Sequence, residues 1–114
     1  MNPFRKPHNV TYQLPGQYVS GEWVAGEEQS STIYCSVQPA KLGEDVLSLP
    51  EGRRISDYRR FYSDVLLPIP EDQEGQQPSL IYVGPDKYQI KERNPWQNGI
   101  INHYKYIAVR VMDG

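Results

Sequence analysis

The sequence predicts a mainly β protein: a small antiparallel β-barrel or sandwich of about six strands with one short helix. Apolar and polar residues alternate in short runs, most clearly in STIYCSVQ at residues 31–38, and this period of two is typical of strands. Ten prolines and nine glycines punctuate the runs with turns. Nine residues are Tyr, beside two Trp and two Phe, and Tyr suits half-buried strands. These observations argue against a helical bundle.

Length and composition narrow the class of protein. The 114 residues correspond to one domain, and only 38% of them are apolar, which predicts a thin core. The start of the chain lacks the apolar run of a signal peptide, and no stretch approaches the roughly 18 apolar residues that span a bilayer. We therefore expect a soluble protein without a membrane partner. The net charge of −2 does not call for a nucleic acid.

The first 16 residues predict an extended N-terminal arm, ahead of a single barrel domain at residues 17–114. Proline fixes φ and removes a hydrogen-bond donor, and three prolines fall in this stretch. A disordered tail is the alternative. Four large apolar residues favour the arm because they have no other obvious place to pack: Phe4, Val10, Tyr12 and Leu14.

Six runs of residues carry strand patterns. The first two are expected to pair as a hairpin, and Asn98-Gly99 is a strong turn signal before the last run. In that last run the alternation predicts that Ile107 and Val109 point inward and Tyr106 points outward. The expected strands cover residues 17–25, 31–38, 55–67, 80–83, 87–93 and 101–112.

Two connecting segments have distinct patterns. Residues 43–49 (GEDVLSL) predict a helix of one or two turns, because acidic residues suit its start and Pro50 stops it. Residues 68–79 (PIPEDQEGQQPS) have no periodicity and predict a long acidic loop rich in Pro and Gly.

No group of residues predicts catalysis or a bound cofactor. His8 and His103 have no partners at metal-ligand spacing, and the only cysteine, Cys35, lies on the apolar face of its predicted strand. The carboxylates fall in turns and loops, where they are solvated rather than held in an apolar pocket. We expect neither an enzyme nor a cofactor or metal protein.

A basic and aromatic cluster lies in the third predicted strand and in the charged turn directly before it. Its arginines form either a solvated face balanced by nearby acids or an arginine-rich contact with a partner. Interleaved aromatic residues could also mimic the face of a single-strand-binding barrel, although the net charge opposes this as the main role. The cluster comprises Arg53, Arg54, Tyr58, Arg59, Arg60, Phe61 and Tyr62.

Three stretches resemble a known family: residues 31–39, 47–63 and 86–111. They contain VQP before the short predicted helix, LPEGRR before a strand, and PWQNG followed by HYK in the last hairpin. The order resembles the small head–tail joining proteins of tailed bacteriophages, also called head-closure, stopper or neck proteins. The resemblance covers most of the chain, and residues 1–16 and 68–79 fall where such proteins vary.

The resemblance implies a structural role in the virion. Members are small β-barrels that form a ring below the portal or adaptor after DNA packaging, close the head and provide the docking surface for the tail. It therefore implies a cyclic ring of six or twelve copies at the head–tail interface, made in the cytoplasm of a bacterial host. The partners would be the portal or adaptor ring, the tail terminator or tail tube and sheath, and the packaged double-stranded DNA nearby. A tail-terminus or baseplate protein of the same fold is the alternative.

The resemblance also suggests which residues make contacts. Arg53 and Arg54 are expected to pair with charges on other subunits or on the ring above. The acidic loop would either line a DNA channel, where like charge lets DNA slide, or face outward as a solubilising tip. Trp96 is expected either to make such a contact or to cover the core as a lid. The expected buried contacts are Phe4, Tyr58, Tyr62 and Trp96, and the loop acids are Glu71, Asp72 and Glu74.

Overall fold

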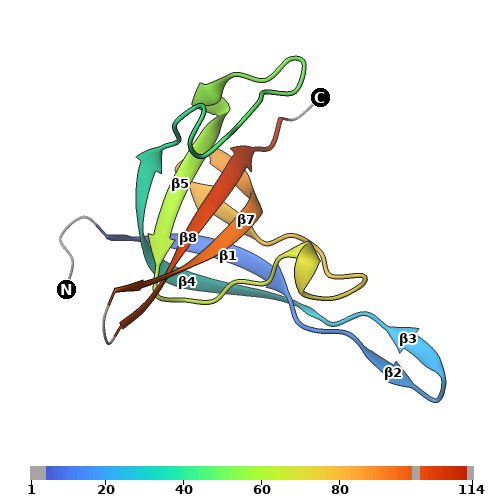
Figure 1. Cartoon of the computed structure of the whole chain (residues 1–114). Coiled ribbons are helices and arrows are strands. Elements are labelled where there is room, and N and C mark those ends of the chain that lie inside the picture. The colour runs from blue at the N-terminus through green and yellow to red at the C-terminus, as the bar shows by residue number, and fades with distance from the viewer. Residues whose placement is uncertain (1–4, 99–100, 113–114) are drawn as a thin grey trace.

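Six antiparallel strands close into a barrel in the order β1-β4-β5-β8-β7-β6, with β6 returning to pair with β1 (Figure 1). The computed structural model describes residues 5–98 and 101–112. The mainly β fold predicted from the sequence is confirmed. The barrel strands are β1 (Lys6–Gln13), β4 (Glu28–Pro39), β5 (Tyr58–Ser63), β6 (Leu80–Val83), β7 (Asp86–Asn98) and β8 (Ile101–Arg110).

The barrel interior holds the main hydrophobic core. Alternation along each strand sends every second side chain inward, and Cys35, predicted on the apolar face of its strand, lies in this core with Ile33. The members of this core leave almost no surface exposed. Its buried residues are Val10, Ile33, Cys35, Phe61, Leu67, Ile69, Ile81, Tyr88, Ile90, Tyr106 and Ala108.

The predicted directions of the side chains on the last strand are wrong. Tyr106 points into the barrel and is completely buried, whereas Ile107 and Val109 belong to a second cluster on the outside of the barrel. The connection between β4 and β5 covers that outer face, and Val46 and Tyr58 join the second cluster. Because both faces of β8 are buried, alternation alone could not reveal which one is the interior.

The N-terminal segment is extended, as predicted, but it is not an arm beside the barrel. Residues 6–13 form β1, which pairs with β4 and, at Val10 and Thr11, with β6. The barrel therefore begins at Lys6, not at residue 17. Pro7 is tolerated because it pairs only with β4, on one side, before the β6 pairing begins. Phe4 lies outside the described residues.

Residues 17–25 do not form a barrel strand. They form a small hairpin of β2 (Gln17–Val19) and β3 (Glu22–Val24), which is a separate two-stranded sheet. The predicted hairpin between residues 17–25 and 31–38 is therefore wrong, since β4 pairs with β1 instead. In Figure 1 this hairpin projects well away from the barrel.

The predicted helix at residues 43–49 is absent, and this stretch is a set of turns. Gly43 has a positive φ of 88°, and the Asp45 carboxylate accepts a hydrogen bond from the Lys41 N–H at 2.8 Å. A side chain that binds the backbone in this way competes with helix formation. The described helical segments are two 3-10 turns, η1 (Ile55–Asp57) and η2 (Pro70–Asp72). The predicted strand at 55–67 is also shorter than expected: residues 55–57 form η1, and only β5 is a strand.

Candidate assembly surfaces

The hairpin arm, residues 14–27, carries exposed apolar residues on an unsupported sheet. Its base continues the barrel ladder, because the Leu14 N–H donates to the Glu27 carbonyl oxygen at 2.8 Å. Its tip is a two-residue turn at Ser20 and Gly21, both with positive φ, which is typical of tight hairpins. The exposed fractions are 72% for Tyr18, 47% for Val19, 43% for Trp23 and 46% for Val24.

Trp23 organises the base of the arm. Its ring meets Tyr18 edge to face, with ring centroids 5.2 Å apart. A Cβ at Gly16 would lie 2.4 Å from the Trp23 ring, so this ring requires glycine beneath it. A groove of about 390 Å³ separates the arm from the β5–β6 loop (residues 64–79), and its lining includes Tyr18, Trp23, Glu74 and Gly75. The arm therefore presents a partly shaped aromatic surface.

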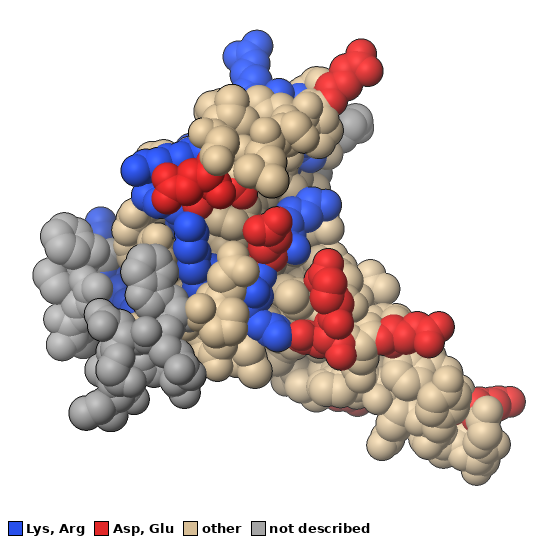
Figure 2. Space-filling model, in the orientation of Figure 1, with Lys and Arg blue, Asp and Glu red and all other residues tan. Residues whose placement is uncertain are grey.

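The surroundings of the arm are acidic. Neither residues 7–40 nor residues 61–86 contain a lysine or arginine. Figure 2 shows acidic side chains along the arm and on the loop beside it, whereas basic side chains lie over the barrel. Glu22 and Glu27 are exposed, and no salt bridge involves either of them in the part of the chain that the structure describes.

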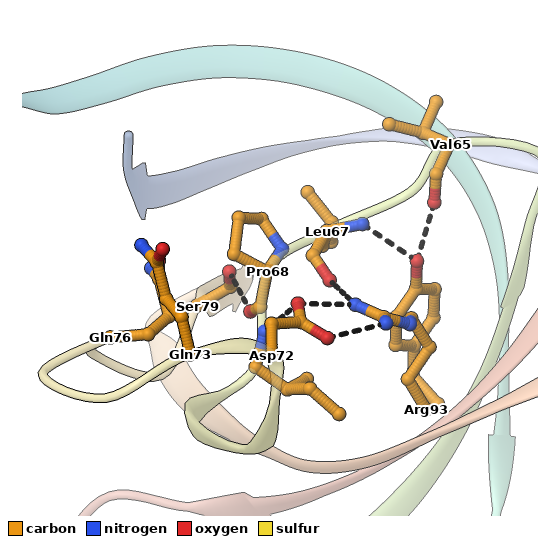
Figure 3. A network of polar contacts seen from close by, with 10 residues as sticks. Val65, Leu67, Pro68, Asp72, Gln73, Gln76, Ser79 and Arg93 are labelled. Carbon is orange, nitrogen blue, oxygen red and sulfur yellow. Dashed lines mark hydrogen bonds and ion pairs between the residues drawn. The ribbon is translucent and has the colours of Figure 1, made fainter. Parts of the chain in front are cut away.

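The β5–β6 loop is held to the barrel by an ion pair. Asp72 binds Arg93 through two hydrogen bonds, of 2.6 and 2.8 Å, and also accepts the Ile69 N–H at 3.0 Å (Figure 3). The hydrogen bonds from Arg93, reinforced by the one from Ile69, outweigh partial burial and hold the pKa of Asp72 below its usual value. The same guanidinium donates to the Leu67 carbonyl oxygen at 2.8 Å. Asp72 is therefore committed within the subunit.

Further contacts fix both ends of this loop. The buried Tyr106 hydroxyl accepts the Leu67 N–H at 2.9 Å and donates to the Val65 carbonyl oxygen (Figure 3). The Ser79 hydroxyl donates to the Pro68 carbonyl oxygen at 2.6 Å. Leu67 and Ile69 fill the core. The loop is thus an anchored lid on the barrel, with the predicted acids Glu71 and Glu74 exposed on its surface.

The β4–β5 connection, residues 40–57, is built around Asp45. Its fully buried carboxylate contacts the Lys105 ammonium at 2.6 Å and lies 3.6 Å from Arg60. Burial acts to raise the pKa of Asp45, but the hydrogen bonds from Lys105 and Lys41 and the charges of Lys105 and Arg60 together lower it. These bonds pin the connection to the outside of the barrel.

The same connection exposes apolar and basic side chains next to each other. Leu42 is 56% exposed and Leu47 is 83% exposed. Lys41 and Arg54 are also exposed. Within the described residues neither cation forms a salt bridge. The exposed Glu44 and Glu51 lie on the same connection, so its surface presents apolar side chains among charges of both signs.

The predicted contact residues divide into those that remain available and those the subunit uses itself. Arg54 is exposed, whereas the Arg53 guanidinium donates to the Arg110 carbonyl oxygen at 2.8 Å. Tyr58 is 8% exposed and packs in the second cluster, so it is a core residue rather than a contact residue. Tyr62 is half buried. The side chain of Trp96 lies outside the described residues.

Sequence reasoning missed the hairpin arm at residues 14–27 and the exposed leucines of the β4–β5 connection. The signal for the arm was present: Ser20-Gly21 stands between Tyr-Val and Glu-Trp-Val, which is the pattern of a two-residue hairpin turn. The exposed Leu42 and Leu47 gave no such signal, because their apolar character fits a helix packed inward equally well.

A further polar cluster lies around Asp64. Arg5 and His103 both contact Asp64 Oδ1, at 2.8 and 2.6 Å, and join the start of β1 to β8. Across residues 5–98 and 101–112, no three His, Cys, Asp or Glu side chains gather as ligands of a metal ion would. No helix in the same residues is long and apolar enough to cross a membrane.

No family model and no curated protein matches the chain. The surfaces described above and the resemblance in the sequence are therefore what indicates a function.

Proposed function

We propose that the protein is a structural subunit of the bacteriophage neck. Copies of it would form a ring that joins the portal or adaptor to the tail and helps to close the head after DNA packaging. The resemblance of residues 31–39, 47–63 and 86–111 to head–tail joining proteins supports this role. A small closed barrel, the fold expected of that family, is compatible with it.

The observation that carries the proposal is the hairpin arm. A two-stranded hairpin alone is marginally stable in water, and this one exposes Tyr18, Val19, Trp23 and Val24. The barrel does not need the arm, since its core closes without it. Exposed apolar patches on soluble proteins mark interaction sites. A subunit that docks on other proteins accounts for an arm of this kind.

The basic and aromatic face is a weaker basis for a nucleic-acid-binding role. Single-strand-binding barrels need free cations beside stacking aromatic rings. Arg60 pairs with Asp45, and the Arg59 guanidinium donates to the Ser56 and Tyr58 carbonyl oxygens at 2.7 and 2.9 Å. Tyr58 is buried. These groups are occupied within the subunit, which favours the structural role.

Electron microscopy of a phage lysate lacking the protein tests this role. A phage that encodes the chain would receive an early stop codon in its gene, with the wild-type chain supplied from a plasmid as the control. We expect free tails beside separate heads, many of which have lost their DNA, and joined particles in the control. Filled heads joined to tails would overturn the proposal, and defects confined to the far tail end would favour the baseplate alternative.

A further inference from the structure

We infer that the hairpin arm of one copy docks on residues 41–54 of the next copy. This inference rests on the proposed ring and names the two surfaces that would build it. The occupant of each surface is a second copy of this chain, and charge complementarity between the two surfaces supports that choice.

The arm exposes apolar groups on both of its faces: Val19 and Val24 share one face with Glu22, and Tyr18 lies on the other. Tyr18, Val19 and Val24 offer exposed apolar area. Glu22, at the start of β3, and Glu27, at the base of the arm, add two exposed carboxylates. A binding surface for the arm must therefore offer apolar groups together with cations.

Residues 41–54 belong to a region of net positive charge, and the exposed Glu44 and Glu51 lie among its cations. Leu42 and Leu47 are exposed, and Lys41 and Arg54 flank them without an ion pair among the described residues. Two β8 cations, Lys105 and Arg110, bind carboxylates of the surrounding segment, residues 41–60. Together with these cations, that segment holds seven Lys and Arg against four Asp and Glu.

The arm is far from this surface on its own chain. Strand β4 begins at Glu28, at the base of the arm, and ends at Pro39, directly before the basic surface. Its 12 residues span about 40 Å when extended. Figure 1 shows the arm and the β4–β5 connection on opposite sides of the barrel. The two complementary surfaces therefore have to meet between different copies.

Contact between two different surfaces of identical subunits is heterologous. Repeating such a contact produces a closed ring if the rotation closes, and an open filament if it does not. A ring requires no further kind of interface. This arrangement matches the cyclic symmetry that the proposed function requires.

A charge-swap experiment tests the pairing in the full-length protein. The first variant, Glu22→Lys with Glu27→Lys, makes the arm basic. The second, Lys41→Glu with Arg54→Glu, makes the docking surface acidic. Sedimentation velocity at low and physiological salt would measure assembly of each variant, of wild type and of a control, Lys91→Glu, whose exposed side chain lies on β7.

We expect each variant alone to require a protein concentration about tenfold higher or more for half-assembly, because it places like charges together. The control should assemble like wild type. Mixing the two variants in equal amounts should restore assembly, because every arm then meets a surface of opposite charge. Because the two variants must then alternate around the ring, the mixture closes only rings with an even number of copies. Circular dichroism of each variant would verify that it is folded.

Three outcomes would overturn the inference. The first is a wild type that assembles while both variants assemble equally well, and the second is a mixture that fails to recover although both variants are folded. The third is a wild-type protein that stays monomeric at all concentrations. None of these decides the proposed function, which the lysate lacking the protein tests independently. Joined particles in that lysate would overturn the function even if the charge swap succeeded.

An apolar substitution provides a second readout at constant charge. Leu47→Ser, at an 83% exposed position, should weaken assembly, whereas Leu66→Ser, at a 57% exposed position on the β5–β6 loop, should not. Equal behaviour of these two variants would contradict the docking of the arm on residues 41–54.

Discussion

The barrel and the hairpin arm use the same kinds of residue in opposite ways. In the barrel, Phe61, Ile81 and Ile90 are completely buried. In the arm, Tyr18 and Val24 have equal strand preference but are 72% and 46% exposed. A strand pattern therefore forecasts local conformation, whereas the number of strands that pack around it decides burial.

Polar groups show the same contrast. Asp72 on the β5–β6 loop and Asp45 on the β4–β5 connection are bound by cations and backbone donors of their own subunit. Glu22 and Glu27 on the arm have no ion pair within the described residues. The described ion pairs thus lie on the barrel and its connections, and neither arm carboxylate takes part in one.

The largest predicted difference is in folding stability. Phe61→Ala should lower the free energy of unfolding by about 3–5 kcal/mol, because it empties part of a fully buried core. Tyr18→Ala should change it by less than about 0.5 kcal/mol, because the side chain is mostly in water. Urea unfolding at a concentration where the protein is monomeric measures both. Equal losses would remove the distinction between the two regions.

The next largest effect is expected at the anchored lid. Tyr106→Phe removes a hydroxyl that binds Leu67 N–H and the Val65 carbonyl oxygen in the interior. Leaving these buried groups unpaired should cost about 1–3 kcal/mol of unfolding free energy. The same urea titration provides the measurement. A variant as stable as wild type would show that the lid does not depend on this hydroxyl.

Acid should weaken the barrel contacts. Hydrogen bonds lower the pKa values of three aspartates: from Arg54 N–H to Asp57, from Arg5 to Asp64, and from Arg93 to Asp72. A carboxyl whose folded-state pKa is lowered stabilises the fold above its unfolded-state pKa of about 3.9, and this contribution is lost as the pH falls through the lower value. Unfolding free energy measured by urea should therefore fall from about pH 5 downward.

Substitution of one of these carboxylates identifies the source of the acid sensitivity. Asp72→Asn should destabilise the protein at neutral pH and give a shallower decline toward acid, so that the two curves converge. Glu74→Gln, an exposed neighbour on the same loop, should follow the wild-type curve. A parallel offset between Asp72→Asn and wild type at every pH would contradict this assignment.

The last predicted difference between the barrel and the arm is in the reactivity of a cysteine thiol. Cys35 is 1% exposed, and burial, opposed by the charge of Arg5, raises the pKa of its thiol to about 12. Iodoacetamide at pH 8 should modify it only slowly, because the thiolate is the reactive form. In a Cys35→Ala background, Tyr18→Cys on the arm should react quickly. Mass spectrometry would follow both, and equally fast modification would show that the barrel interior is open.

The predictable part of the fold follows from local patterns. The alternation around Ile33 and Cys35 and the Asn98-Gly99 turn signal identified strands that the structure contains. The role of residues 6–13 was not predictable, because Pro7 indicates an irregular segment unless the one-sided pairing of its strand is known. The helix prediction failed because the Asp45 carboxylate binds the backbone and Lys105.

The contact residues were harder to predict than the fold. Arg54 was predicted to make a contact because it lies in an arginine cluster; it is exposed, and its contact role stays a prediction. Tyr58 was misassigned because burial by the β4–β5 connection depends on contacts between distant residues. Asp72 was expected to be a free acid, but Arg93, distant in the sequence, binds it.

Hydrogen exchange below and above the concentration of assembly tests the central claim most directly. In the monomer, amides of β2 and β3 should exchange much faster than those of β4 and β8. On assembly, residues 17–24 and 41–54 should gain protection together, while the outer surface of β7 at Lys91 should not change. Assembly that protects other segments and leaves both of these unchanged would contradict the account.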